Sequence, residues 1–115
     1  MFKFEQLDVW KLSIDLYRKI AAATRKLQPV SRRFLADQIR RAALSISANI
    51  AEGTGRSGTR ESKYFFGIAK GSTYEVVSIA HILRQESLFQ SEDFFEIYQM
   101  SDRIAKMLSG LIAKS

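Results

Sequence analysis

One stretch of the chain decides the fold: residues 32–53 read RRFLADQIRRAALSISANIAEG. Steps of three and four residues, typical of one helix face, separate its inward positions, which are Leu35, Ile39, Ala42, Ile46 and Asn49. Many other side chains in the stretch are small, so a neighbouring helix could approach closely. We therefore expect a helix over 32–53, with Ser31 as its N-cap and Gly53 as its C′ residue.

Three further amphipathic segments predict helices over 8–27, 59–87 and 91–113. Pro29 ends the first of them, because the residue before a proline is pushed out of the α region. No segment sustains the period-2 alternation of a strand. The expected fold class is all-α, an antiparallel up-and-down four-helix bundle that forms a single domain over residues 1–115.

The pattern also predicts which side of each helix faces the core. In segment 8–27 the expected inward positions are Leu7, Val9, Trp10, Ile14, Leu16, Tyr17, Ile20, Ala21 and Leu27. In segment 59–87 they are Tyr64, Phe65, Ile68, Ser72, Val76, Ile79 and Leu83. Gly67 and Gly71 each cost about 1 kcal/mol relative to alanine inside a helix, so we expect close helix packing to compensate.

Composition excludes several classes of protein. The chain has 115 residues, 46% of them hydrophobic, and no cysteine, so neither a disulfide framework nor a thiolate metal site is expected. The longest uncharged apolar stretch, residues 42–51, is far shorter than the roughly 20 residues that span a bilayer. Residues 1–7 lack the apolar region of a signal peptide. We expect a cytoplasmic protein with no membrane partner.

Charge is distributed unevenly along the chain. The net charge is +6; residues 1–58 hold 11 basic and 5 acidic residues, whereas residues 59–115 hold seven of each. Such asymmetry favours a polyanionic partner, RNA or DNA, bound through its phosphate backbone. The candidate contacts are Arg18, Lys19, Arg25, Arg32, Arg33, Arg40, Arg56, Arg60 and Lys63. A surface that is basic only for solubility is the open alternative.

Motifs that would indicate a cofactor do not fit their context. Gly53, Gly55 and Gly58 match G-x-G-x-x-G, but no strand precedes them and no second strand follows, so dinucleotide binding is not expected. The same loop lacks the Lys-Ser/Thr pair of a phosphate-binding P-loop. A di-iron site needs two Glu-x-x-His motifs, and the single histidine, His81, follows Ser78 at that spacing. We expect no metal, no cofactor and no catalytic residue.

Several polar residues fall near the expected inner faces. Glu52 and Glu75 could form the acid and base of a small enzyme. The favoured interpretation is a structural network in which Arg41 neutralises the acids, because an unpaired buried charge is costly. The members of this network are Arg41, Asn49, Glu52, Ser72 and Glu75.

Four stretches carry a resemblance to a known family. They are Gln38–Gly53, then Gly55-Arg56, then Ile68–Ser72 with Glu75, and Leu7–Trp10 near the start. Together they resemble the four-helix-bundle proteins encoded in intervening sequences of bacterial 23S ribosomal RNA genes. Two positions depart from the pattern: Ser47 stands where members often carry proline, and Ser31-Arg32-Arg33 replaces the usual acids.

The resemblance implies an all-α bundle that assembles as a ring-like homo-oligomer, commonly a pentamer, with no known enzymatic activity. A related group serves as the accessory protein of diversity-generating retroelements, in which a basic pentamer binds nucleic acid and a reverse transcriptase. We therefore expect a non-enzymatic homo-oligomer that binds RNA or DNA. The alternative is a protein-interaction scaffold, or an accessory subunit of a larger nucleic-acid enzyme, that docks through Phe2, Phe4, Phe89 and Phe95.

Overall fold

The computed structural model describes residues 1–27 and 32–114 of the chain. A short 3-10 helix, η1 (Lys3–Gln6), leads into four α-helices, which are α1 (Asp8–Arg25), α2 (Arg33–Thr54), α3 (Thr59–Gln85) and α4 (Ser91–Lys114). Within the described ranges there is no strand. The roles predicted for Pro29 and Ser31 fall outside the described residues.

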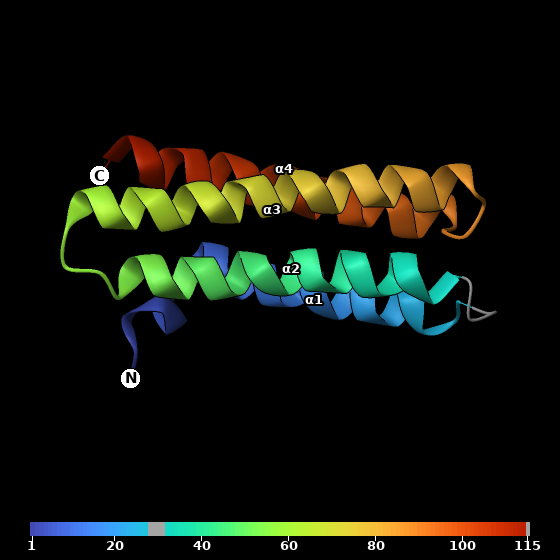
Figure 1. The fold of residues 1–115 in the computed structure, drawn as a ribbon, viewed down its shortest axis with the longest axis horizontal. Helices are drawn as coiled ribbons and strands as arrows, with labels where there is room; N and C mark the ends of the chain where they lie inside the picture. The colour runs from blue at the N-terminus through green and yellow to red at the C-terminus, as the bar shows by residue number, and fades with distance from the viewer. Residues whose placement is uncertain (28–31, 115) are drawn as a thin grey trace.

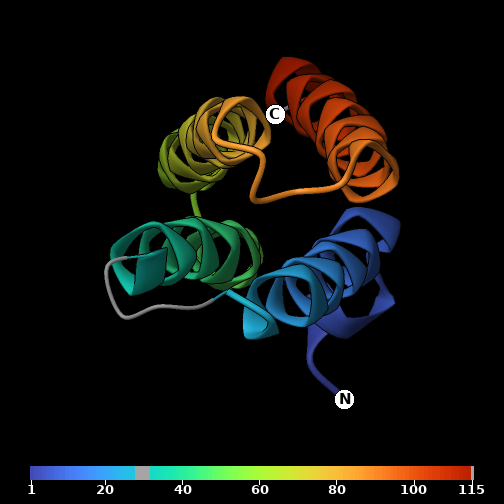
Figure 2. The same ribbon diagram turned by 90° about the vertical axis from the view of Figure 1, so that its right-hand side faces the viewer.

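The four long helices run side by side in alternating directions (Figure 1). Seen along the bundle, they occupy the corners in chain order (Figure 2), and α4 completes the circuit by packing on α1. The bundle measures 45 × 21 × 21 Å. This is the predicted antiparallel up-and-down four-helix bundle.

The bundle has two distinct ends. At the Gly55 end lie both termini of the chain and the connection between α2 and α3 (Figure 1). At the Arg25 end lie the C-terminus of α1, the N-terminus of α2 and the connection between α3 and α4. These two names are used below.

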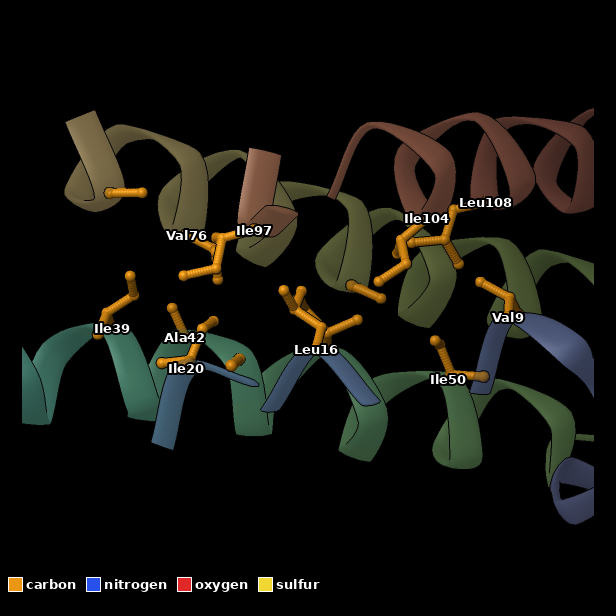
Figure 3. Close-up of a cluster of buried hydrophobic side chains, with 14 of the residues drawn as sticks. Val9, Leu16, Ile20, Ile39, Ala42, Ile50, Val76, Ile97, Ile104 and Leu108 are labelled. Atoms are coloured by element: carbon orange, nitrogen blue, oxygen red, sulfur yellow. The ribbon is translucent and has the colours of Figure 1, made fainter. Parts of the chain in front are cut away.

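The core consists of aliphatic side chains that all four helices contribute to the axis (Figure 3). Members with no solvent exposure include Leu16, Ile20, Ile39, Ile46, Ile50, Val76, Ile97, Ile104 and Leu108. Burying each such side chain stabilises the fold by about 1.5–3 kcal/mol. Their removal from water is therefore the main force that holds the helices together.

Small residues let α2 and α3 make the most extensive contact in the bundle. Gly53 shows this most clearly, because a Cβ built on it would lie 2.6 Å from Cε1 of Phe66. Gly53 is a buried residue within α2, and Gly55 caps the helix. The predicted C′ role of Gly53 is therefore wrong. The packing of the Phe66 ring, not a turn, requires glycine at this position.

Two predicted helices extend two residues beyond their observed ends. Helix α1 ends at Arg25 and α3 at Gln85, whereas the pattern extended each to 27 and 87. After α3 the chain turns at Ser87, whose φ of 59° lies in the left-handed region. The backbone N–H groups of Leu88 and Phe89 both donate to the carbonyl of Leu83, at 2.8 and 3.2 Å. The buried ring of Phe89 anchors this connection.

One predicted inward position on α3, and two glycines that were expected to pack closely, lie at the surface instead. Tyr64 is 65% exposed, so its assignment to the core is wrong. Gly67 and Gly71 are exposed too, and a Cβ added to either would meet nothing within 4 Å beyond its chain neighbours and the nearby backbone of its own helix. The expected close packing inside the bundle is therefore absent at both glycines. Their cost to the helix is not compensated within one copy of the chain.

Candidate nucleic-acid interface

The basic residues concentrate in one part of the chain. Residues 18–41 contain eight lysines and arginines and a single acid, Asp37. This segment forms the half of α1 and the half of α2 nearest the Arg25 end. We define the Arg25-end surface as Arg18, Arg25, Lys26, Arg33, Arg40 and Arg41, of which all but the half-buried Arg40 are exposed.

Arg40 is held in place by a neighbouring helix. Its Nε donates a 2.8 Å hydrogen bond to Oγ1 of Thr24, which is buried between α1 and α2. The Thr24 hydroxyl in turn donates to the carbonyl of Ile20 at 2.7 Å. A fixed guanidinium loses less side-chain entropy when it binds phosphate, and its two terminal nitrogens can form a fork with phosphate oxygens. Arg40 is thus the most ordered cation of the surface.

Lys19 does not belong to this free surface. Its Nζ lies 2.8 Å from Oδ1 of Asp93 and 3.0 Å from Oε2 of Glu96, both on α4. Hydrogen bonds to these two carboxylates, Asp93 first, raise the pKa of the Lys19 ammonium above its ordinary value of 10.5. Lys19 therefore links α1 to α4. The sequence analysis predicted that its ammonium group binds phosphate, but Asp93 and Glu96 already neutralise that charge.

Arg32 occupies an intermediate position. Its Nη1 lies 3.9 Å from Oε1 of Glu86 in the connection between α3 and α4. Such a long, half-exposed pair contributes little to stability and breaks readily. Arg32 can thus exchange this carboxylate for a phosphate.

Arg56, Arg60 and Lys63 form a separate group at the Gly55 end. Helix α2 has 22 residues, so at 1.5 Å per residue about 33 Å separates this group from Arg33. Nη2 of Arg56 lies 2.6 Å from Oε2 of Glu52, and its guanidinium stacks on the Phe65 ring at 4.7 Å. Arg60 and Lys63 are exposed. The nine predicted contacts therefore form two groups rather than one surface around α2.

The polar network differs from the predicted one because its members are neutral. The hydroxyls of Ser45 and Ser72 lie 2.8 Å apart between α2 and α3. The Asn49 amide donates to the backbone carbonyl of Ser45 at 2.8 Å and to its hydroxyl at 3.0 Å. Asn49 and Ser72 are thus joined through Ser45, a residue that the predicted set omits.

The charged members of the predicted network lie at the surface. Arg41, Glu52 and Glu75 are exposed, where water solvates their charges, and Glu52 pairs with Arg56 instead of Arg41. The prediction that Arg41 neutralises buried acids is wrong. Arg41 belongs with the cations of the Arg25-end surface. Arg33, Asp37 and Arg41 follow one another at intervals of four residues, which places them on one face of the helix. This charged stripe was the feature of the sequence that indicated an exposed position for Arg41.

The described residues offer neither a metal-binding cluster nor a membrane-spanning helix. Across residues 1–27 and 32–114, no three histidine, cysteine or acidic side chains gather in a way that could hold a metal ion. None of the helices in that part of the chain is long and apolar enough to span a bilayer. His81 is exposed and packs edge-on against the Phe94 ring at 4.9 Å.

Comparisons with known proteins agree with this architecture. The profile of the family described as 23S rRNA-intervening sequence protein matches residues 5–110. A crystal structure from Bacteroides thetaiotaomicron VPI-5482, titled as a protein with unknown function from the S23 ribosomal protein family, is similar in fold. The TM-score is 0.73 at 22% identity, over 90% of this chain and 97% of that one. Comparison with curated proteins finds no significant match.

Proposed function

This chain belongs to the family of 23S rRNA-intervening sequence proteins, and we propose that it is a non-enzymatic protein that binds RNA or DNA through the Arg25-end surface. One observation carries the proposal. Exposed cations cluster on adjacent halves of two helices, while the only acid in that segment is Asp37. The shortest ion pairs among the described residues involve other cations, namely Lys19, Arg56 and Lys106.

Contacts of this kind read the nucleic-acid backbone rather than its sequence. Guanidinium groups bind phosphate oxygens in pairs, and each neutralised phosphate releases a condensed counterion. The affinity should therefore depend steeply on salt and weakly on base sequence. A cytoplasmic location, where RNA and DNA are accessible in a bacterium, suits this role.

We propose that the functional unit is a homo-oligomer. Gly67, Lys70, Gly71 and Tyr74 line a shallow hollow on the outer face of α3. The two glycines weaken the helix by about 1 kcal/mol each, and a neighbouring copy that fills the hollow would compensate for this cost. The family resemblance favours five subunits. Repeating a modestly basic surface around a ring strengthens binding through multivalency.

A scaffold for a protein partner is the second candidate function. A groove between α3 and α4, lined by Tyr74, Val77, Tyr98 and Ser101, favours it. The hydroxyl of Ser101 is buried there, and it has no hydrogen-bond partner among the described residues. A partner enzyme such as a reverse transcriptase could place an apolar side chain in this groove. Of the phenylalanines considered for docking, Phe2 and Phe95 are exposed, whereas Phe89 is buried.

The test compares two double variants that lose the same charge. Arg25→Ala with Arg33→Ala removes two cations of the Arg25-end surface, and Arg103→Ala with Lys114→Ala removes two exposed cations of α4. We expect the first pair to weaken binding of a labelled RNA duplex by about 10- to 100-fold, and the second by less than about threefold. Fluorescence anisotropy measures the Kd. Equal losses in the two variants would contradict the proposal.

A further inference from the structure

The N-terminal segment forms a groove against the end of α2. Residues 2–4 make one wall, and the last turn of α2 with Arg56 makes the other, around a cavity of about 550 Å³. Its side-chain lining includes Phe2, Lys3, Phe4, Glu52 and Arg56. This volume lies within the range of small-ligand pockets. The groove lies at the Gly55 end, away from the surface described above.

Hydrogen bonds hold the wall formed by the N-terminal segment in place. The backbone N–H of Phe2 donates to Oε1 of Glu5 at 2.8 Å, and the N–H of Glu5 donates to the carbonyl of Phe2 at 3.1 Å. The N–H of Leu7 donates to the carbonyl of Phe4 at 3.0 Å. Phe2 is thus presented by an ordered turn. A preformed platform lowers the entropy cost of binding.

The two aromatic rings of this wall continue into a third, that of Trp10 on α1. The Phe2 and Phe4 rings are stacked, with centroids 5.9 Å apart and planes inclined by 22°. Phe4 meets Trp10 edge-on at 5.0 Å. Phe4 and Trp10 are half-buried, but Phe2 at the outer end is 72% exposed. The row therefore ends in a ring on which a further planar group can stack.

Charge around the groove favours an anionic ligand. Lys3 and Arg56 line it together with a single acid, Glu52. Arg56 lies 2.6 Å from Glu52 and 4.0 Å from Glu61, so the exposed Lys3 is the lining cation left for a ligand. Two cations against one acid leave the groove net positive. The exposed Arg60 lies on the first turn of α3, immediately beyond the loop that follows α2.

We propose that this groove binds single-stranded nucleic acid, with an unpaired base stacked on Phe2 and the adjoining phosphate held by Lys3. The inference rests on the nucleic-acid binding proposed above and specifies the form of the partner. Base–aromatic stacking requires an exposed π-face, which a base inside a duplex does not offer. A purely apolar ligand would leave Lys3 without a role. The Arg25-end surface contacts backbone in either form of nucleic acid.

The experiment compares three probes on the full chain without an N-terminal tag: a single-stranded oligoribonucleotide, its duplex, and an abasic oligomer with the same backbone. The key variant is Phe2→Ala. Phe2→Trp tests whether any aromatic ring suffices, and Phe95→Ala removes another exposed phenylalanine, which lies on α4. Anisotropy gives the Kd for each pair. Fluorescence of Trp10, the only tryptophan, reports on the ring row during titration.

We expect Phe2→Ala to weaken single-strand binding by about tenfold and to leave the duplex and abasic probes within about twofold. Phe2→Trp and Phe95→Ala should bind all three probes as the unchanged protein does. The single strand should perturb Trp10 fluorescence, and the abasic oligomer should not. Equal affinity of the unchanged protein for single-stranded and abasic probes would overturn the inference, as would a Phe2→Ala effect no larger than that of Phe95→Ala.

The same measurements distinguish failure of the stacking inference from failure of the nucleic-acid binding proposed for the whole protein. If only the stacking inference is wrong, the duplex still binds and still weakens in the Arg25→Ala, Arg33→Ala variant. If no probe binds, both proposals fall. If a peptide or protein, rather than any nucleic acid, is captured through Phe2, the groove is a protein site and the inference is overturned.

Discussion

The half of the bundle formed by α1 and α2 differs from the half formed by α3 and α4, although both contribute equally to one core. The α1–α2 half presents the cations of the Arg25-end surface, and many of its small residues are buried inside the bundle, where they allow close helix packing. The α3–α4 half is close to neutral and exposes glycines and tyrosines, including Gly67, Gly71, Tyr74 and Tyr98. The same fold thus separates a face suited to a polyanion from a face suited to another protein surface.

Reversing charge in one half or the other tests this difference most strongly. The triple variant Arg25→Glu, Arg33→Glu, Arg41→Glu and its control Arg103→Glu, Lys106→Glu, Lys114→Glu each lower the net charge from +6 to zero. We expect the first to weaken RNA binding by on the order of 1000-fold, because repulsion replaces attraction at the contacts, and the control by about tenfold or less. Anisotropy at fixed salt measures both. Equal losses would mean that net charge alone matters.

Replacing a glycine by alanine should have opposite effects on stability in the two halves. At Gly53 the new Cβ would meet the Phe66 ring at 2.6 Å. We expect Gly53→Ala to lower the free energy of unfolding by about 1–2 kcal/mol, since overpacking outweighs the gain in helix propensity. Urea denaturation measures it. Gly55→Ala, whose Cβ would make only ordinary contacts at 3.6 Å, is the control. Unchanged stability of Gly53→Ala would show that Phe66 moves freely.

On α3, replacement of Gly67 and Gly71 by alanine should stabilise the helix and impair assembly. Each substitution adds up to about 1 kcal/mol of helix propensity without a clash inside the chain. Added methyl groups would, however, fill the hollow proposed for a neighbouring copy. Light scattering should report a smaller particle for the double variant and an unchanged one for Gly110→Ala, an exposed glycine of α4. An intact oligomer in the double variant would place the subunit contact elsewhere.

The ion pairs that join the two halves give the smallest effect. Lys19→Met should lower the free energy of unfolding by about 0.5–1 kcal/mol, because Lys19 connects α1 to two acids of α4. Lys106→Met, which breaks a pair within α4, should change it by about 0.3–0.5 kcal/mol or less.

The contribution of Lys19 also depends on pH. Its pKa is higher in the folded than in the unfolded chain, so the stabilisation is fully present below pH 10.5 and is lost as the pH rises through the raised folded value. Urea denaturation between neutral pH and pH 11 should therefore show the two proteins, with and without Lys19, converging at the alkaline end. A constant difference would mean that the lysine stabilises through packing alone.

Long, strongly periodic segments explain why the bundle could be predicted from the sequence. The errors occur where polar residues satisfy themselves locally. Ser13 and Thr24 are buried in α1 because their hydroxyls donate to carbonyls of their own helix, those of Trp10 and Ile20. The core face of α1 is therefore rotated toward Ser13 and away from Trp10, which is only half-buried. A pattern of apolar residues alone does not reveal such self-satisfied hydroxyls.

The candidate interface was only partly predictable. Charge counts correctly located the basic half, but they could not show that Lys19 faces Asp93, 74 residues away in the chain. Nor could they show that Arg33 and Arg60 lie near opposite ends of the bundle, since that separation depends on the direction of each helix. Tertiary contacts decide which cations remain free for a partner.

The dependence of RNA affinity on salt tests the central claim most directly. If the six cations of the Arg25-end surface each neutralise one phosphate, a plot of log affinity for duplex RNA against log salt concentration should fall with a slope of about −5 per bound subunit. The Arg25→Ala, Arg33→Ala variant should reduce that slope by about two. A flat plot for the unchanged protein would contradict the account.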